Sequence, residues 1–143
     1  ILPYKTDAGS GSLEQMALAE FCKENFNSHV KTIKNKLQKK SEAICNALDK
    51  YFGSSAEYKK PDGGIFVWVD MHKKVDTSRL YELALKDGVA INPGNEWSIN
   101  KSGRHKMRLC FGNPSIKEID EGIKRLAIIC RKEFGIPTKI ANL

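Results

Sequence analysis

Residues 60–69 read Lys-Pro-Asp-Gly-Gly-Ile-Phe-Val-Trp-Val, a tight turn followed by an apolar run. Proline, aspartate and glycine supply the backbone angles that a turn needs. β-branched and aromatic residues dominate 65–69, so this run predicts a strand. Because the strand is apolar on both faces, we expect it to lie inside a sheet that helices cover.

Further elements are expected on both sides of this strand. Residues 56–60 predict a short strand before the turn. Asp76 is placed to cap a helix, and Gly88 is placed to end that helix in the left-handed conformation. Residues 89–91 predict another short strand, and the polar residues 95–105 predict a loop.

The last strand and the last helix have the clearest patterns. Residues 106–111 alternate, which predicts a strand with Met107, Leu109 and Phe111 on one face and Lys106, Arg108 and Cys110 on the other. Ser115 followed by Glu118 has the form of a capping box. The helix that it opens carries apolar residues at helical spacing, namely Ile116, Ile119, Ile123, Leu126 and Cys130.

The first third of the chain predicts two helices. Ser12 and Gln15 have the form of a capping box, and the helix that follows should have an inner face of Leu13, Met16, Ala17 and Phe21. A break is expected at 25–27. A long helix at about 27–52 then stops before Gly53.

Length and composition limit the class of protein. The chain has 143 residues, of which 41% are hydrophobic and 29% charged, a globular mixture that argues against disorder and against a fibrous protein. Its longest apolar runs are too short to span a membrane. The expected fold class is α/β, with a small mixed or antiparallel sheet covered by helices. The chain starts with Ile1, so we expect it to be a piece of a larger protein.

The chain is basic, with 24 Lys and Arg against 17 Asp and Glu and a net charge of +7. Such an excess can indicate nucleic-acid binding. However, the lysines concentrate in the long helix, mostly opposite its apolar positions: Lys31, Lys34, Lys36, Lys39 and Lys40. A solvated helix face explains them better than a nucleic-acid groove.

Cysteine and histidine spacing gives no sign of a metal site. The four cysteines lie in apolar stretches without a CxxC pair, which favours reduced, core-filling thiols in a cytosolic protein: Cys22, Cys45, Cys110 and Cys130. The three histidines, His29, His72 and His105, are scattered without ligand spacing.

Arg108 is the most informative candidate for a functional residue. It lies in the middle of a strand, where a charge is costly unless a partner neutralises it. A guanidinium can bind a carboxylate through two parallel hydrogen bonds, so an anionic ligand is one explanation. By pattern alone, a salt bridge to a neighbouring acid or exposure on a solvated sheet face is the stronger one. Trp97 could face a ligand or form a lid packed on its own domain, and the second is favoured.

Four segments, taken in order, resemble the C-terminal region of class I/II aminotransferases. They are residues 60–69, residues 85–94 (Leu-Lys-Asp-Gly-Val-Ala-Ile-Asn-Pro-Gly), residues 107–111 (Met-Arg-Leu-Cys-Phe) and residues 119–126 (Ile-Asp-Glu-Gly-Ile-Lys-Arg-Leu). These enzymes are pyridoxal-phosphate proteins of fold type I, and the 2-aminoadipate/aromatic branch is the most similar. The resemblance covers roughly residues 11–134.

The resemblance implies a role for each part. Arg108 matches the arginine that binds the substrate's α-carboxylate, and Gly63 and Gly64 match the glycine pair before a small-domain strand. Residues 1–26 would end the large domain. Residues 27–143 would form the small domain, entered by the helix at 27–52. Amino acid and 2-oxo acid substrates, a homodimer and a cytoplasmic location are implied for the whole protein.

The resemblance also has gaps. The motif of the Schiff-base lysine is not found, and the context of Lys5 does not match it. We therefore expect the chain alone to be inactive, with no catalytic residue of its own. Two alternatives stay open: an aminotransferase-like regulator or other pyridoxal-phosphate enzyme domain, and a small basic nucleic-acid-binding module.

The lysine face gives a first test. Replacing Lys31 and Lys34 with Gln should change the free energy of unfolding by less than about 0.5 kcal/mol in urea denaturation, because solvated charges contribute little. Specific nucleic-acid binding at physiological salt that these changes abolish would favour the nucleic-acid-binding alternative.

Overall fold

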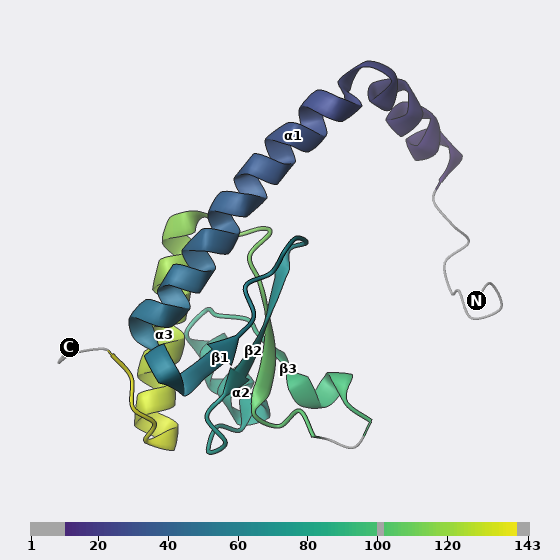
Figure 1. The fold of residues 1–143 in the computed structure, drawn as a ribbon. Helices are drawn as coiled ribbons and strands as arrows, with labels where there is room; N and C mark the ends of the chain where they lie inside the picture. The colour runs from purple at the N-terminus through teal and green to yellow at the C-terminus, as the bar shows by residue number, and fades with distance from the viewer. Residues whose placement is uncertain (1–10, 100–101, 140–143) are drawn as a thin grey trace. The chain divides into compact units, whose positions relative to one another are not determined.

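The computed structural model describes residues 11–99 and 102–139. Its strands form one antiparallel sheet in the order β1–β2–β4–β3 (Figure 1). The strands are β1 (Ala56–Tyr58), β2 (Phe66–Met71), β3 (Asn92–Pro93) and β4 (Lys106–Cys110). The helices are α1 (Ser12–Tyr51), α2 (Thr77–Lys86) and α3 (Ile116–Phe134), with short 3-10 turns at Gly53–Ser55 and Gly94–Trp97. The predicted α/β class with a small antiparallel sheet is confirmed.

The chain divides into two compact units, Ile1–Asn35 and Lys36–Leu143. α1 is continuous through 25–27, so the predicted break there is wrong. Polar side chains in this stretch bond to carbonyls of the preceding turn: Asn25 Nδ2 donates to Phe21 O (3.2 Å), and Ser28 Oγ donates to Asn25 O (3.0 Å). These bonds are compatible with a helix and do not break it.

In the first unit, the predicted inner helix face is exposed. Leu13, Met16 and Phe21 are 77%, 70% and 42% exposed. The described part of this unit holds α1 alone, so no second element covers these side chains. The pattern identified an apolar face correctly but not what would bury it.

The core of the second unit lies between the sheet and the helices. Every second side chain of β2 and β4 points into this core. The C-terminal part of α1 and the inner faces of α2 and α3 cover it. Its fully buried side chains include Leu48, Val69, Leu80, Met107 and Leu126. Figure 1 shows the end of α1 beside α3. Burying a large aliphatic side chain stabilises a fold by about 1.5–3 kcal/mol, so these positions hold the layers together. Ile116, the first apolar residue of the helical spacing in α3, is 51% exposed, because it lies in the first turn of the helix.

Two details of the predicted sheet are wrong. Residues 89–91 form no strand, because the Val89 N–H closes the end of α2 on Ala84 O (2.8 Å) and the sheet pairing begins at Asn92. β2 lies inside the sheet as predicted, but the described residues leave one of its faces open. Phe66 and Trp68 on that face are 39% and 40% exposed.

The cysteine prediction holds for two of four thiols. Cys45 and Cys130 are buried, whereas Cys22 is half-buried and Cys110 is exposed. Burial raises the pKa of the Cys130 thiol to about 12, so it stays protonated at neutral pH. Among the described residues, no helix has the length and apolar composition needed to span a membrane.

Three helix termini follow the sequence signals. Ser115 and Glu118 form the reciprocal bonds of a capping box, and Gly88 adopts a φ of 75° after α2. The Asp76 carboxylate accepts from the N–H groups of Ser78 (3.0 Å) and Arg79 (3.3 Å). Burial alone would raise the pKa of Asp76, but these bonds and the one from Arg104 Nε (3.1 Å) outweigh it and lower the pKa.

The Asp76 cap gives a stability test with a defined pH dependence. Asp76→Ala should cost about 0.5–2 kcal/mol in urea denaturation at neutral pH. Because folding lowers the pKa of Asp76, its stabilisation is present above the unfolded pKa of about 4 and is lost as the pH falls through the folded value. The difference in the free energy of unfolding between wild type and Asp76→Ala should therefore disappear at acid pH.

Asp62 provides the control for this cap. Its carboxylate is 93% exposed, and its contact with Lys59 Nζ is long, at 3.8 Å. Asp62→Ala should therefore change the free energy of unfolding by less than about 0.5 kcal/mol at every pH. Equal losses from both variants would contradict the capping role.

Candidate substrate-carboxylate site

Arg108 lies at the centre of β4, on the face of the sheet opposite the core. Its neighbours along the strand, Met107 and Leu109, are buried on the other face. Across the sheet it is paired with Trp68 of β2 on one side and Asn92 of β3 on the other. The strand alternation predicted from the sequence is therefore correct, and it directs the guanidinium to the open face.

Two aromatic rings enclose the guanidinium of Arg108. Its Cζ atom is 4.1 Å from the ring centroid of Phe66 and 4.1 Å from that of Trp97. Both distances lie well inside the range of cation–π contacts. Phe66 starts β2, and Trp97 ends the 3-10 turn after β3, so the two rings reach the arginine from separate segments.

The hydrogen bonding of Arg108 is incomplete among the described residues. Nη2 donates to Asn92 Oδ1 at 3.4 Å, a long and therefore weak bond. Nε is buried without a partner. No described carboxylate forms an ion pair with Arg108, so the salt-bridge explanation favoured by the sequence pattern finds no acid here.

The nearby acid on the same face is already paired. Asp70 of β2 contacts Lys106 Nζ at 2.5 Å and His105 Nε2 at 3.3 Å. Lys106 is the neighbour of Arg108 on this face of β4, and it has the partner that Arg108 lacks. The site thus presents a cation whose N–H donors are incompletely bonded among the described residues, and a planar carboxylate supplies the acceptors that suit them.

The turns singled out in the sequence have different surroundings. Gly63 and Gly64 are exposed, and Gly64 has a φ of 78° that favours glycine in the turn before β2. Gly94 follows Pro93 and is buried, and a Cβ there would lie 2.5 Å from Gly103 O. The backbones of Gly94 and Gly103, which lie before and after Trp97 in the chain, are therefore in close contact.

Trp97 packs on its own domain, as the sequence favoured. Its ring contacts the Arg108 guanidinium, although the residue is 56% exposed. Sequence reasoning missed Phe66 and Asn92. The alternation of β2 placed Phe66 on one face, but the strand pairing that sets it beside Arg108 is a tertiary feature.

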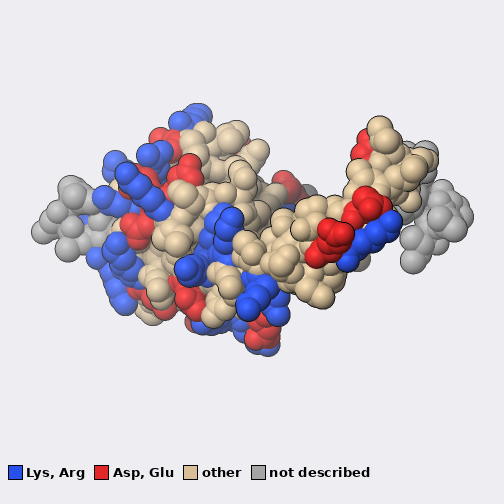
Figure 2. All heavy atoms as spheres, turned by 90° about the horizontal axis from the view of Figure 1, so that it is seen from above, with Lys and Arg blue, Asp and Glu red and all other residues tan. Residues whose placement is uncertain are grey.

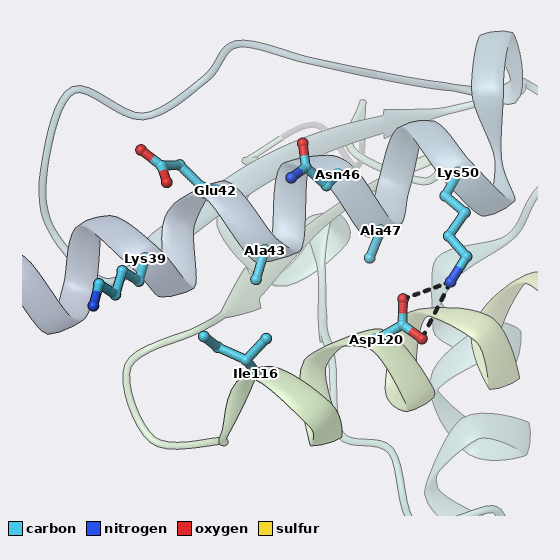
Figure 3. Close-up of a pocket in the computed structure, with 8 residues that line it drawn as sticks. All are labelled: Lys39, Glu42, Ala43, Asn46, Ala47, Lys50, Ile116 and Asp120. Atoms are coloured by element: carbon cyan, nitrogen blue, oxygen red, sulfur yellow. Dashed lines mark hydrogen bonds and ion pairs between the residues drawn. The ribbon is translucent and has the colours of Figure 1, made fainter.

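A separate groove of about 420 Å³ lies between α1 and α3 (Figure 3). Figure 3 shows Lys50 directed at Asp120, with Nζ 3.1 Å from Oδ1, and Ala43 and Ala47 of α1 facing the helix that carries Ile116. The Tyr51 hydroxyl also donates to Asp120 (2.9 Å), and chiefly this bond lowers the pKa of the carboxyl. Arg108 does not line this groove. Among the described residues that line it, Lys50 and Asp120 form an ion pair with each other.

The chain belongs to the aminotransferase class I and II family, whose model matches residues 4–126. It is 31% identical, over 84% of its length, to a 2-aminoadipate transaminase of Thermus thermophilus, and covers 30% of that protein. It is 32% identical, over 92% of its length, to an uncharacterised HTH-type transcriptional regulator of Bacillus subtilis, and covers 27% of it.

A solved aminotransferase structure is also similar to this chain. The chain superimposes on an alpha-aminoadipate aminotransferase of Thermus thermophilus, complexed with N-(5'-phosphopyridoxyl)-L-leucine, with a TM-score of 0.81 and 29% identity. The match covers 88% of this chain and 32% of the other. The chain therefore spans about a third or less of the length of these relatives.

The site predicts that Arg108 contributes little to stability. Arg108→Met should change the free energy of unfolding by less than about 1 kcal/mol, because the lost cation–π contacts are offset by removal of an unpaired buried Nε. Leu109→Ala, on the buried face of the same strand, should cost about 2–5 kcal/mol. Urea denaturation measures both, and a loss at Arg108 as large as that at Leu109 would identify a structural arginine.

Proposed function

We propose that this chain acts as the C-terminal part of a pyridoxal-phosphate-dependent aminotransferase and that Arg108 binds the α-carboxylate of its amino acid and 2-oxo acid substrates. The observation that carries the proposal is the arginine itself: a guanidinium held on an open sheet face, without a carboxylate partner among the described residues. Membership of the aminotransferase family supports the reaction class.

The chain's own residues would bind and orient the substrate. A carboxylate gripped through two parallel N–H···O bonds loses its rotational freedom, which fixes the direction of the bonds at the neighbouring α-carbon. The aromatic rings next to Arg108 would exclude part of the water around the guanidinium and so strengthen the ion pair. Pyridoxal phosphate, when bound, supplies the electron sink for the reaction.

The described residues fit a carboxylate and not the cofactor. Lys40 and Lys106, two partly buried lysines, are both engaged: Lys40 Nζ donates to Gly112 O (2.8 Å), and Lys106 pairs with Asp70. We assign no residue of this chain to holding pyridoxal phosphate. The Schiff-base lysine of the proposed enzyme would lie outside the region that this chain covers in its relatives.

The proposal extends to substrate, assembly and location. The relatives named for 2-aminoadipate, one of them bound to a leucine derivative, make 2-aminoadipate and leucine the first amino donors to test. We propose a homodimer for the whole protein, as in the family, with residues 1–26 ending its large domain and residues 27–143 forming its small domain. The free cysteines of the described chain suit a reducing cytoplasm.

An aminotransferase-like regulator is the second candidate. The observation in its favour is the match to a transcriptional regulator at 32% identity. Such a protein would use the same carboxylate site to sense an amino acid. Fusion of the parent polypeptide to a DNA-binding segment, together with leucine binding without turnover, would favour the regulator over the enzyme.

A basic nucleic-acid-binding module is less consistent with the charges. Figure 2 shows acidic side chains interspersed with the basic ones. Several cations of the second unit are paired, including Arg79 with Glu133, Arg125 with Glu121 and Arg104 with Asp76. Paired charges attract phosphate weakly, so a nucleic-acid groove is not favoured.

Arg108 provides the test in the full-length protein. Arg108→Lys keeps the charge and loses the two-pronged geometry, so kcat/KM for L-leucine should fall about ten- to a hundredfold, since a charge-assisted hydrogen bond contributes about 1.5–3 kcal/mol. Arg108→Ala should lower it further. Isoamylamine, which is leucine without its carboxylate, should react at nearly the same low rate in all three proteins.

The comparison between the two amines decides the role. Equal losses on leucine and isoamylamine, or unchanged leucine kinetics in Arg108→Ala, would show that Arg108 does not bind the substrate carboxylate.

A further inference from the structure

The rings of Phe66 and Trp97 enclose Arg108 without being part of the hydrophobic core. They are 39% and 56% exposed, while the core side chains of the same sheet are almost fully buried. Partial exposure of single aromatic side chains is normal, so the informative feature is what the two rings contact. Their shared feature is the guanidinium between them, 4.1 Å from each centroid.

The two rings restrict how Arg108 can meet a ligand. Each ring lies close to the Cζ atom of Arg108, so a ligand can approach only from the directions that the rings leave free. The guanidinium donors are incompletely bonded among the described residues: Nη2 has only the 3.4 Å bond to Asn92 Oδ1. A carboxylate in the plane of the guanidinium accepts from such donors in a bidentate pair.

The segment that carries Trp97 is anchored at its two ends. Gly94 and Gly103 approach so closely that a Cβ on either would meet the backbone of the other. The Gly103 N–H donates to Ser98 Oγ (3.1 Å), beside Trp97. These contacts restrain the described backbone close to Trp97, whose ring centroid lies 4.1 Å from Arg108 Cζ.

Resting on the proposed function, we propose that Phe66 and Trp97 are positioning residues for the substrate carboxylate: through their contacts with Arg108 they hold its guanidinium in one place on the open sheet face. A free arginine side chain loses considerable rotational entropy when it binds. Here that entropy is lost on folding, so the substrate binds a preorganised partner.

The test uses the full-length protein and a direct binding measurement. Trp97→Leu and Phe66→Leu should each raise the dissociation constant of L-leucine about three- to thirtyfold by calorimetry, the range that a cation–π contact supports. Trp97→Phe, which keeps an aromatic face, should restore most of the affinity. Turnover of isoamylamine should stay at the wild-type level in all these variants, because it has no carboxylate to position.

Trp68 supplies a matched control. It lies on the same strand and face as Phe66, is 40% exposed and is the cross-strand partner of Arg108. The described structure nevertheless shows no cation–π contact between its ring and the arginine. Trp68→Leu should therefore leave the leucine dissociation constant within about twofold of wild type, well below the change expected for a lost cation–π contact.

A double-mutant cycle separates this proposal from the proposed function. In an Arg108→Met background, Trp97→Leu should cause no further loss of leucine affinity, because the ring acts through the arginine. An equal loss in both backgrounds, or a Trp68→Leu effect as large as that of Trp97→Leu, would overturn the positioning role. Loss of leucine affinity in Arg108→Met without any change in Trp97→Leu would overturn it too, while leaving the carboxylate site intact.

Discussion

The antiparallel pairing of β2 with β4 is the constraint on which the rest of the second unit depends. It sets Val67 opposite Leu109 and Val69 opposite Met107, and these four side chains form one buried face of the sheet. Because side chains alternate along a strand, the same pairing must place Phe66, Trp68 and Arg108 on the other face. A slip of one residue would bury the arginine and expose the core. Hydrophobic burial on one side thus fixes the charged site on the other.

The electrostatics of the open face separate Arg108 from its neighbours. Lys106 forms an ion pair with the carboxylate of Asp70, which also contacts His105 Nε2, so the charge of Lys106 is neutralised within the fold. Arg108 instead has aromatic rings, a long bond to Asn92 and a buried Nε without a partner. A protein gains no stability from an unpaired buried donor, so such a group needs an explanation. A substrate carboxylate supplies one that also agrees with the family.

The same site is compatible with catalysis and with sensing. Enzymes and HTH-type regulators both match this chain at about 30% identity. A grip on an α-carboxylate serves either purpose, since it selects amino acids without performing chemistry. The groove between α1 and α3 is separate from Arg108, and its Lys50–Asp120 ion pair joins the two helices.

The sequence by itself determined the α/β class, the helix caps at Asp76 and Ser115, and the face of β4 to which Arg108 points. These features depend on local rules, namely turn chemistry, capping and the alternation of side chains. It placed a break in α1 and a strand at 89–91 that do not exist, because polar side chains and the closing bonds of α2 satisfied the backbone in another way. Only the tertiary structure decided that Phe66 and Trp97 meet at Arg108. That contact joins residues far apart in the chain, and strand register and the close approach of Gly94 to Gly103 create it, neither of which a one-dimensional pattern encodes.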